Sequence, residues 1–194
     1  MEYSNLFLVP IQISHLELNI PSLISFSYEM QRKNEDGAKL TNVGGWQSDD
    51  VFNETHSEFV ELKNKIEEAA NTYHKDIGLK DNLKEKIGNI WININEKGHL
   101  NELHHHPHSI LSGAFYLRGN APIVFKHPFP HINTYFWDQS IIEEWNGITS
   151  SMWTIEPSPN LLLLFPSWVE HKVHYNKENT DRISLSFNTN IQVN

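Results

Sequence analysis

Strict alternation of apolar and polar residues in the second half of the chain is the feature that most constrains the fold. In residues 182–188, polar side chains at even positions alternate with apolar side chains at odd positions, and residues 88–95 carry isoleucine at every second position. Successive side chains of a strand point to opposite faces, so each segment predicts a strand with one apolar and one polar face. The polar face of the last strand consists of Arg182, Ser184, Ser186 and Asn188.

The other segments predict a mainly β domain with its helices first. Apolar spacing predicts helices over residues 21–33 and 57–75, and Pro10 predicts an edge position for a short strand over residues 5–13. A Gly-rich turn is expected at 41–50 and a long aromatic insertion at 128–150. Further strands are expected over residues 110–118, 122–127 and 151–156, with a strand pair over 160–165 and 168–175 interrupted by Pro166. About seven strands after two helices predict a closed or sandwiched antiparallel sheet with helices on one side.

Composition narrows the function classes. The 194 residues suit one domain, residues 1–194, and the formal net charge of -9, without any Lys/Arg-rich run, argues against a nucleic-acid-binding protein. No apolar run reaches the roughly 18 residues of a membrane span, and the first residues do not resemble a signal peptide. The chain has no cysteine, which excludes disulfides and thiolate metal sites and makes the cytoplasm the expected location.

A histidine cluster predicts a metal site. The sequence from Asn101 to His108 contains four histidines in five positions. On an extended backbone His104 and His106 share one face and can reach one ion, whereas His105 points to the other face. His171, at the end of a later strand-like segment, is the best third ligand, and imidazole suits iron, zinc, copper and nickel. The alternative, a solvated histidine-rich loop, stays open.

Arg182 predicts a binding site for a carboxylate. Inside a barrel, a guanidinium beside the Ser184 hydroxyl offers a carboxylate a bidentate fork and one further donor. The alternation also fits an exposed polar face on an edge strand, so the pattern leaves both interpretations open.

Four motifs together resemble a known family. They are Gly98-x-x-Asn101-x-x-His104-x-His106, Leu111-Ser-Gly-x-x-Tyr-Leu117, Leu164-Phe-Pro-Ser-Trp168-x-x-His171 and Arg182-Ile-Ser-x-Ser-Phe-Asn188. In order and spacing they resemble the uncharacterised 2-oxoglutarate/Fe(II)-dependent oxygenases of phages and bacteria, which are related to the prolyl 4-hydroxylase-like oxygenases. The turn Gly44-Gly-Trp-Gln-Ser48 fits the same family.

This resemblance implies a double-stranded β-helix, or jelly-roll barrel, that hydroxylates a C–H bond with Fe(II), 2-oxoglutarate and O₂. It implies His104, His106 and His171 as metal ligands, and Arg182 with Ser184 as the site for the distal carboxylate of 2-oxoglutarate. Three further residues are expected to add hydrogen bonds in the pocket: Tyr116, Asn95 and Ser112. One position departs from the wider superfamily, which has Asp or Glu where this chain has His106. No catalytic residue is expected beyond the metal ligands.

Two other functions remain open from the sequence. One is a cupin-like three-His dioxygenase or isomerase that does not use 2-oxoglutarate, and the other is a non-enzymatic jelly-roll module with a binding or structural role. The substrate class is equally open between a peptide, a free amino acid and a small metabolite. The aromatic segment 129–137 is either a substrate lid or an ordered surface loop, and an edge strand near the N-terminus could pair in a homodimer.

Overall fold

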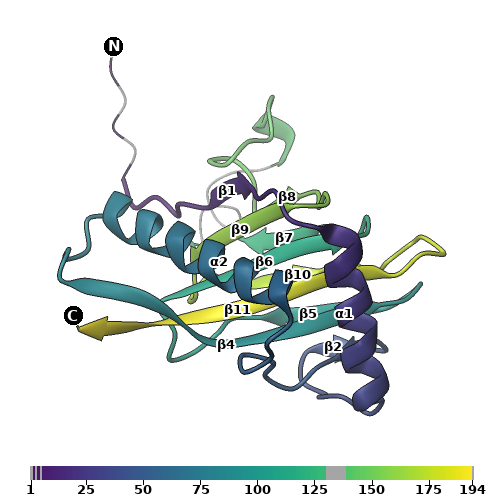
Figure 1. Cartoon of the computed structure of the whole chain (residues 1–194). Helices are drawn as coiled ribbons and strands as arrows, with labels where there is room; N and C mark the ends of the chain where they lie inside the picture. Colours follow the sequence, from purple (N-terminus) through teal and green to yellow (C-terminus); the bar gives the residue numbers. More distant parts are fainter. Residues whose placement is uncertain (1, 3, 5, 130–138, 194) are drawn as a thin grey trace.

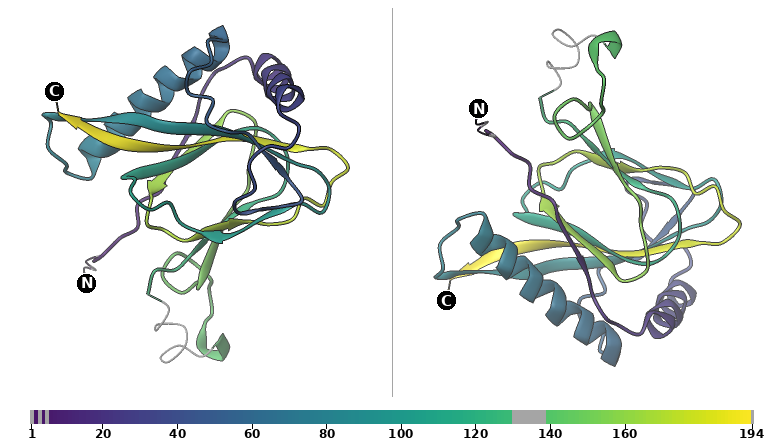
Figure 2. Two further views of the ribbon diagram at one scale, coloured as in Figure 1. Left: turned by 90° about the horizontal axis from the view of Figure 1, so that it is seen from below. Right: turned by 90° about the horizontal axis from the view of Figure 1, so that it is seen from above.

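Two antiparallel sheets face each other and form a barrel, with two helices outside one of them (Figure 1, Figure 2). The computed structural model describes residues 2, 4, 6–129 and 139–193. Its helices are α1 (Ile20–Lys33), α2 (Ser57–Asp76) and the short 3-10 helix η2 (Gln139–Ile141). Its strands are β1 (Gln12–His15), β2 (Asn42–Val43), β3 (Trp46–Gln47), β4 (Leu83–Asn95), β5 (Leu100–His104), β6 (Leu111–Arg118), β7 (Ile123–Lys126), β8 (Met152–Ile155), β9 (Leu161–Pro166), β10 (His171–Val173) and β11 (Arg182–Val193).

The strand order is that of a jelly-roll. The larger sheet has the order β1-β9-β6-β11-β4-β3 and the smaller sheet the order β2-β5-β10-β7-β8. From β4 onward the chain passes back and forth between the two sheets, except at β7 and β8, which are consecutive and pair with each other in the smaller sheet. The predicted mainly β fold with helices on one side is therefore confirmed. The predicted pairing of 160–165 with 168–175 is wrong, because β9 pairs with β1 and β6 whereas β10 pairs with β5 and β7.

The helices bury the outer face of the larger sheet. Pro21 lies in the first turn of α1, whose N-cap Asn19 accepts a hydrogen bond from the backbone N–H of Ser22. The apolar stripe of α2 includes Phe59, which is fully buried. These helices pack on the apolar faces of β4, β6, β9 and β11 in one continuous core. The opposite faces of the same strands are thereby free to line the inside of the barrel.

A bulge at Gly88 changes which residues of β4 face the helices. Asn188 pairs with Asn89 and Thr189 pairs with Ile87, so Gly88 is the extra residue of the bulge. A Cβ at Gly88 would lie 2.4 Å from the end of the exposed Asn190 side chain, so a larger residue there would require that side chain to move. The shift leaves Asn89 in the cavity wall and directs Ile87 into the core beneath the helices.

A buried polar cluster ties α2 to this end of the sheet. His74 on α2 donates from Nδ1 to Glu85 over 3.0 Å and from Nε2 to the carbonyl of Lys80 over 3.0 Å. Thr189 donates to the other oxygen of Glu85 over 2.6 Å. Since the ring is bonded to two acceptors, the interactions favour a protonated imidazolium, and the pKa of His74 is raised despite the opposing effect of its burial.

Other predicted elements differ in extent. Both helices are confirmed within a residue or so, but the structure has eleven strands rather than about seven within its described ranges. The first strand begins at Gln12, after Pro10, and it is an edge strand as predicted. The Gly-rich segment 41–50 forms the short strands β2 and β3, which belong to different sheets. None of the helices described is long and apolar enough to span a membrane.

The insertion between β7 and β8 projects away from the barrel in its described part. Figure 2 shows the segment around η2 standing off the body of the molecule. Of the aromatic residues predicted to form a lid, Phe129 is half exposed at 48 %, whereas Tyr135, Phe136 and Trp137 lie outside the described residues.

Candidate metal centre

Strand register brings two of the predicted histidine ligands together. His171, the first residue of β10, lies directly opposite His104, the last residue of β5. Directly opposed side chains lie on the same face of a sheet about 5 Å apart, and these two ring centroids are 4.4 Å apart. His106 follows the end of β5, where its backbone N–H donates to the carbonyl of Ser167 over 2.9 Å. One ligand atom from each of the three histidines lies within 4.8 Å of the others.

Backbone hydrogen bonds select the tautomer of two of the three histidines. Nδ1 of His104 donates to the carbonyl of Glu102 over 2.7 Å, and Nδ1 of His171 donates to the carbonyl of Val169 over 2.9 Å. With the proton on Nδ1, the Nε2 lone pair of each ring is free to bind a cation. This arrangement, in which the second ring nitrogen is fixed by a hydrogen bond, is typical of metal-binding histidines.

Burial keeps the three imidazoles neutral. It is the largest cause of the lowered pKa of all three rings, and the positive charge of the neighbouring rings lowers it further. The pKa of His106 falls to about 3 and that of His171 to about 4. Since a metal binds the neutral ring, the three side chains are ready to bind an ion at neutral pH.

No carboxylate joins the three histidines within the described ranges. Glu102, the nearest acid in sequence, is exposed and contacts His104 through its carbonyl oxygen rather than its side chain. His105 is exposed and outside the cluster of possible ligands, but it lines the cavity beside them rather than pointing to the other face as the alternation predicted. The donor set is therefore three neutral nitrogens, a set that suits first-row transition metals such as iron and nickel.

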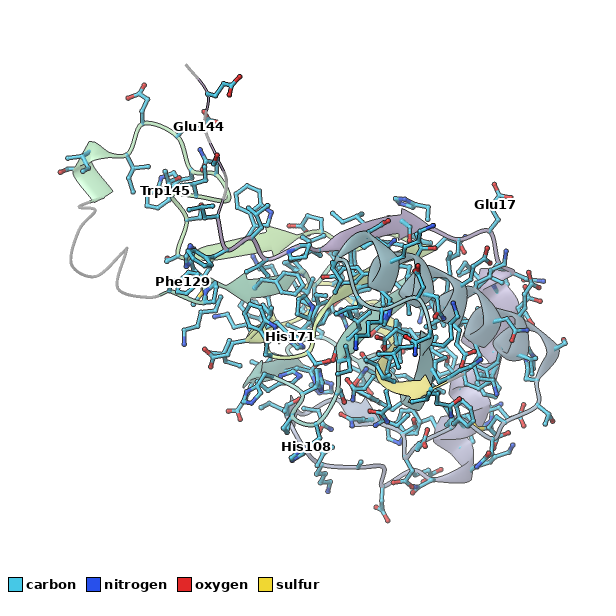
Figure 3. The ribbon with its side chains drawn as sticks, turned by 90° about the vertical axis from the view of Figure 1, so that its left-hand side faces the viewer. Glu17, His108, Phe129, Glu144, Trp145 and His171 are labelled. Carbon is cyan, nitrogen blue, oxygen red and sulfur yellow. The ribbon has the colours of Figure 1, made fainter. Side chains whose placement is uncertain are left out.

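A cavity of about 410 Å³ inside the barrel connects the histidines with the polar face of β11. In Figure 3, His171 lies within the barrel, and the arm that carries Glu144 and Trp145 stands well away from it. Walls of the cavity come from both sheets. They include Gln47, Trp91, Asn93, Tyr116, Phe165, Arg182, Ser184, Ser186 and Asn188 beside the three histidines. The polar face predicted for 182–188 thus faces inward, and the edge-strand alternative does not hold.

Arg182 is a buried cation without an anionic partner. Its side chain is 2 % exposed, and it donates from Nε to the carbonyl of Ala121 and from Nη1 to Ser184 Oγ, both over 3.0 Å. None of the ion pairs among the described residues involves Arg182. Its burial lowers its pKa, as expected for a charge removed from water. A buried unpaired charge is costly, so this end of the cavity is built for an anion.

Tyr116 completes the polar end. Its ring lies 5.2 Å from the Arg182 guanidinium carbon, and its buried hydroxyl lies beside that cation without a well-formed hydrogen bond. Burial raises the pKa of Tyr116, so the phenol stays protonated and can donate. A carboxylate held by Arg182 and Ser184 would also satisfy this hydroxyl.

Two predicted pocket residues lie outside the cavity wall. Asn95 is buried and donates to Asn101 over 3.3 Å, although its Oδ1 has no partner among the described residues. Ser112 is fully buried and its hydroxyl links Asn188 and Ser167 over 2.7 and 2.8 Å. Neither residue lines the cavity. The structure therefore brings together six of the eight predicted site residues, and gives Ser112 the role of joining β6 to its neighbours.

Sequence analysis missed much of the cavity wall, and two of its residues show why. Gln47 lies on β3, a strand of two residues that is too short for an alternation to be seen. Trp91 was expected on the polar face of its strand but not beside a ligand, and its ring centroid is 5.6 Å from that of His106. Both residues depend on contacts between segments far apart in sequence.

Sequence comparison gives one family. The profile of the family described as "Putative 2OG-Fe(II) oxygenase" matches residues 89–188, which include all three histidines and Arg182. That range is slightly more than half of the 194 residues. No curated protein matches the chain significantly in sequence.

Solved structures share the fold at low sequence identity. The prolyl-4-hydroxylase of Pseudomonas putida is 13 % identical with a TM-score of 0.59, over 92 % of this chain and 91 % of that one. The carbocyclase SnoK from nogalamycin biosynthesis is 11 % identical with a TM-score of 0.65, over 92 % and 78 %. HygX from Streptomyces hygroscopicus, solved with nickel and 2-oxoglutarate bound, is 9 % identical with a TM-score of 0.60, over 93 % and 82 %. At these identities the likeness establishes the jelly-roll fold.

Proposed function

Since this chain belongs to the 2OG-Fe(II) oxygenases, whose cofactors are Fe(II) and 2-oxoglutarate, we propose that it hydroxylates a C–H bond of its substrate. In this proposal the single domain of residues 1–194 binds Fe(II) through His104, His106 and His171. It binds the distal carboxylate of 2-oxoglutarate through Arg182 and Ser184. The iron and the keto acid supply the oxygen-activating redox chemistry when they are bound.

The donor set fits the metal. Three neutral imidazoles whose ligand atoms lie within 4.8 Å of one another can occupy one face of an octahedral ion. Two of the rings are fixed by Nδ1 hydrogen bonds to carbonyls, so they need little reorganisation when the ion binds. Phe165 packs against His171 with ring centroids 4.8 Å apart, and this contact keeps water from one side of the site.

The Arg182 end fits a carboxylate. Nε of Arg182 is held by the carbonyl of Ala121, which fixes the direction of the guanidinium. Ser184 and Tyr116 offer neutral donors on either side, and both line the same cavity as the histidines. A dicarboxylate that spans the cavity can therefore neutralise the buried guanidinium and satisfy the Tyr116 hydroxyl in one binding event.

One observation carries this proposal: a buried, unpaired arginine shares a cavity with a cluster of three histidines. The two features have no common structural purpose in an empty barrel, since each is costly to bury alone. Together they bind the two ends of one keto acid. The three-His dioxygenase or isomerase without 2-oxoglutarate predicts no function for Arg182. The non-enzymatic module predicts no function for either feature.

The test is an anaerobic titration of 2-oxoglutarate into the Fe(II)-loaded protein, followed by the visible charge-transfer band of the metal-bound keto acid. The wild type and Ser25→Ala should give a saturable band, because Ser25 is exposed on α1 and does not line the cavity. Ser184→Ala should need more 2-oxoglutarate, and His171→Ala should lose both band and iron. Far-UV circular dichroism of each variant checks its fold. Iron without a band would favour the dioxygenase or isomerase that does not use 2-oxoglutarate. A protein without stoichiometric iron would favour the structural module.

The cytoplasmic location and the homodimer stay predictions of the sequence.

A further inference from the structure

Of the three histidines of the proposed metal site, His106 has the weakest support from regular structure. His171 is paired on both sides, with His104 on β5 and with Phe125 on β7. The rings of His104 and His171 are also fixed by hydrogen bonds to backbone carbonyls. His106 lies two residues beyond the end of β5, and no hydrogen bond of its side chain is found in the described part of the chain. Its position therefore depends on what holds its backbone.

The backbone of Ser167 contacts both ends of the turn that carries His106. The Ser167 carbonyl accepts from the N–H of His106 over 2.9 Å, and the Ser167 N–H donates to the carbonyl of Ile110 over 3.1 Å. Between these two contacts the chain turns at His108, whose backbone is left-handed with φ at 66°. This conformation is uncommon for residues other than glycine, so the turn needs contacts at its ends to keep its shape.

Ser167 lies in a second turn, residues 166–169, which connects β9 to β10. The N–H of Val169 donates to the carbonyl of Pro166 over 3.0 Å and closes this turn. The carbonyl of Val169 accepts from Nδ1 of His171 over 2.9 Å. The 166–169 turn therefore contacts two of the three possible ligands, His106 through its backbone and His171 through its ring.

The hydroxyl of Ser167 anchors the 166–169 turn to the larger sheet. Ser167 is 1 % exposed, and its Oγ lies 2.8 Å from Oγ of Ser112 on β6. Ser112 donates its single hydroxyl proton to Oδ1 of Asn188 on β11 over 2.7 Å, so Ser167 is the donor in the contact between the two serines. A buried chain of hydrogen bonds in which every member is satisfied makes its surroundings rigid.

We propose that Ser167 is a positioning residue of the metal site, which holds His106 where its imidazole can bind the ion together with His104 and His171. The assignment rests on the proposed function, because it concerns the metal of the same site. The hydroxyl of Ser167 acts through the backbone carbonyl that His106 contacts. Since His171 is held by strands on both sides, the loss of the anchor should affect His106. Partners that orient metal ligands typically contribute about 10–100-fold to metal affinity.

Ser167→Ala tests the anchor. It removes the hydroxyl but leaves Ser112 bonded to Asn188, so no buried donor loses its partner and the variant should fold. It should bind Ni(II) about tenfold more weakly than the wild type. The assay is calorimetric titration of Ni(II), an ion that suits imidazole, into the metal-free protein without 2-oxoglutarate. The variant His104→Ala/His171→Ala measures the Ni(II) that other surface groups bind.

A second series of titrations separates positioning from a general loss of stability. In the His106→Ala background, Ser167→Ala should not lower the affinity for Ni(II) any further, because the ligand that it positions is absent. Ser27→Ala on α1 is the matched control. Ser27 is fully buried and donates to the carbonyl of Leu23 over 2.8 Å, so its loss affects stability without reaching the metal site. This control should leave the affinity for Ni(II) unchanged in both backgrounds.

Ser112→Ala removes the acceptor of the same hydroxyl and replaces the first variant if that one does not fold. It should weaken Ni(II) binding by a similar factor and leave the 2-oxoglutarate affinity of the metal-saturated protein unchanged. Wild-type Ni(II) affinity in the folded variants, or an equal loss of affinity in the His106→Ala background, would overturn the assignment of Ser167. A wild type that binds no more Ni(II) than His104→Ala/His171→Ala would refute the metal site itself, and with it the proposed function on which the assignment rests.

Discussion

Replacing Arg182 by methionine tests whether the buried guanidinium exists to hold 2-oxoglutarate. Methionine fills much of the same space but carries no charge. In the metal-loaded wild type, a ligand at one hundred times its Kd stabilises the fold by about 2.7 kcal/mol. For a chain of this size each kcal/mol moves Tm by about 2–4 °C, so 2-oxoglutarate should raise Tm by about 5–11 °C.

The variant should lose most of that increase. Truncating one partner of a buried, hydrogen-bonded charge pair costs at least about 2 kcal/mol of binding, or about a 30-fold loss of affinity. At the same concentration the remaining stabilisation is about 0.9 kcal/mol, which corresponds to a Tm increase of about 2–4 °C. The assay is thermal unfolding with saturating Ni(II), an ion that imidazole binds, with and without 2-oxoglutarate.

The stability of the ligand-free variant should change little by comparison. Losing the guanidinium removes the donor to the Ala121 carbonyl, which costs about 1–3 kcal/mol, but it also removes an unpaired buried charge. Arg118→Met is the matched control, because Arg118 bonds to Tyr28 and the Asp181 carbonyl and does not line the cavity. A full Tm increase of Arg182→Met with 2-oxoglutarate would refute the assignment of the carboxylate site.

Three further predictions test other parts of the structure. His106→Asp should still bind one metal ion per chain, as measured by metal analysis. Its affinity for 2-oxoglutarate should fall several-fold, because the new carboxylate adds a negative charge beside the anionic cosubstrate. An unchanged affinity would contradict the assignment of His106 as a metal ligand. Ser112→Ala should lower the free energy of unfolding, measured in urea, by about 1–3 kcal/mol without changing the 2-oxoglutarate titration. If the variant no longer binds 2-oxoglutarate, Ser112 takes part in the pocket after all. Because the pKa of His74 is raised in the folded state, its charged ring should stabilise the fold fully below about pH 6.5, the ordinary pKa of histidine. This stabilisation should be lost as the pH rises through the folded-state pKa. Urea unfolding measured from about pH 6.5 upward should show this loss of stability. Glu85→Gln should make the loss smaller. If this variant keeps the wild-type dependence of stability on pH, another group is responsible.

Alternation along single strands was the most reliable guide to the site. The period of two correctly placed Arg182 and Ser184 on one face with Ser186 and Asn188, and that face lines the cavity. The same pattern placed the isoleucines of β4 in the core. A period of two is a local property of the backbone, so it can be read without knowledge of the partner strand.

Contacts between distant segments could not be read in this way. The closeness of His104 and His171 depends on the register of β5 against β10, which is set by the whole barrel. The local pattern proposed both residues as ligands of one ion, and the family resemblance implied the same pair. Asn95 and Ser112 were predicted to line the pocket, but they do not. Each lies on a strand near the site and bonds through its side chain to neighbours outside the cavity wall. Gln47 was missed because two residues of β3 carry no periodicity.

The charges of the proposed site show what the replacement of the usual carboxylate by His106 would change. Fe(II) with three neutral imidazoles keeps both positive charges, and Arg182 adds a third. Bound 2-oxoglutarate supplies two negative charges, so the loaded site carries a surplus of one positive charge, whereas a triad of two histidines and a carboxylate would leave none. In a buried cavity this surplus strengthens the binding of the anionic cosubstrate and repels cations from the iron.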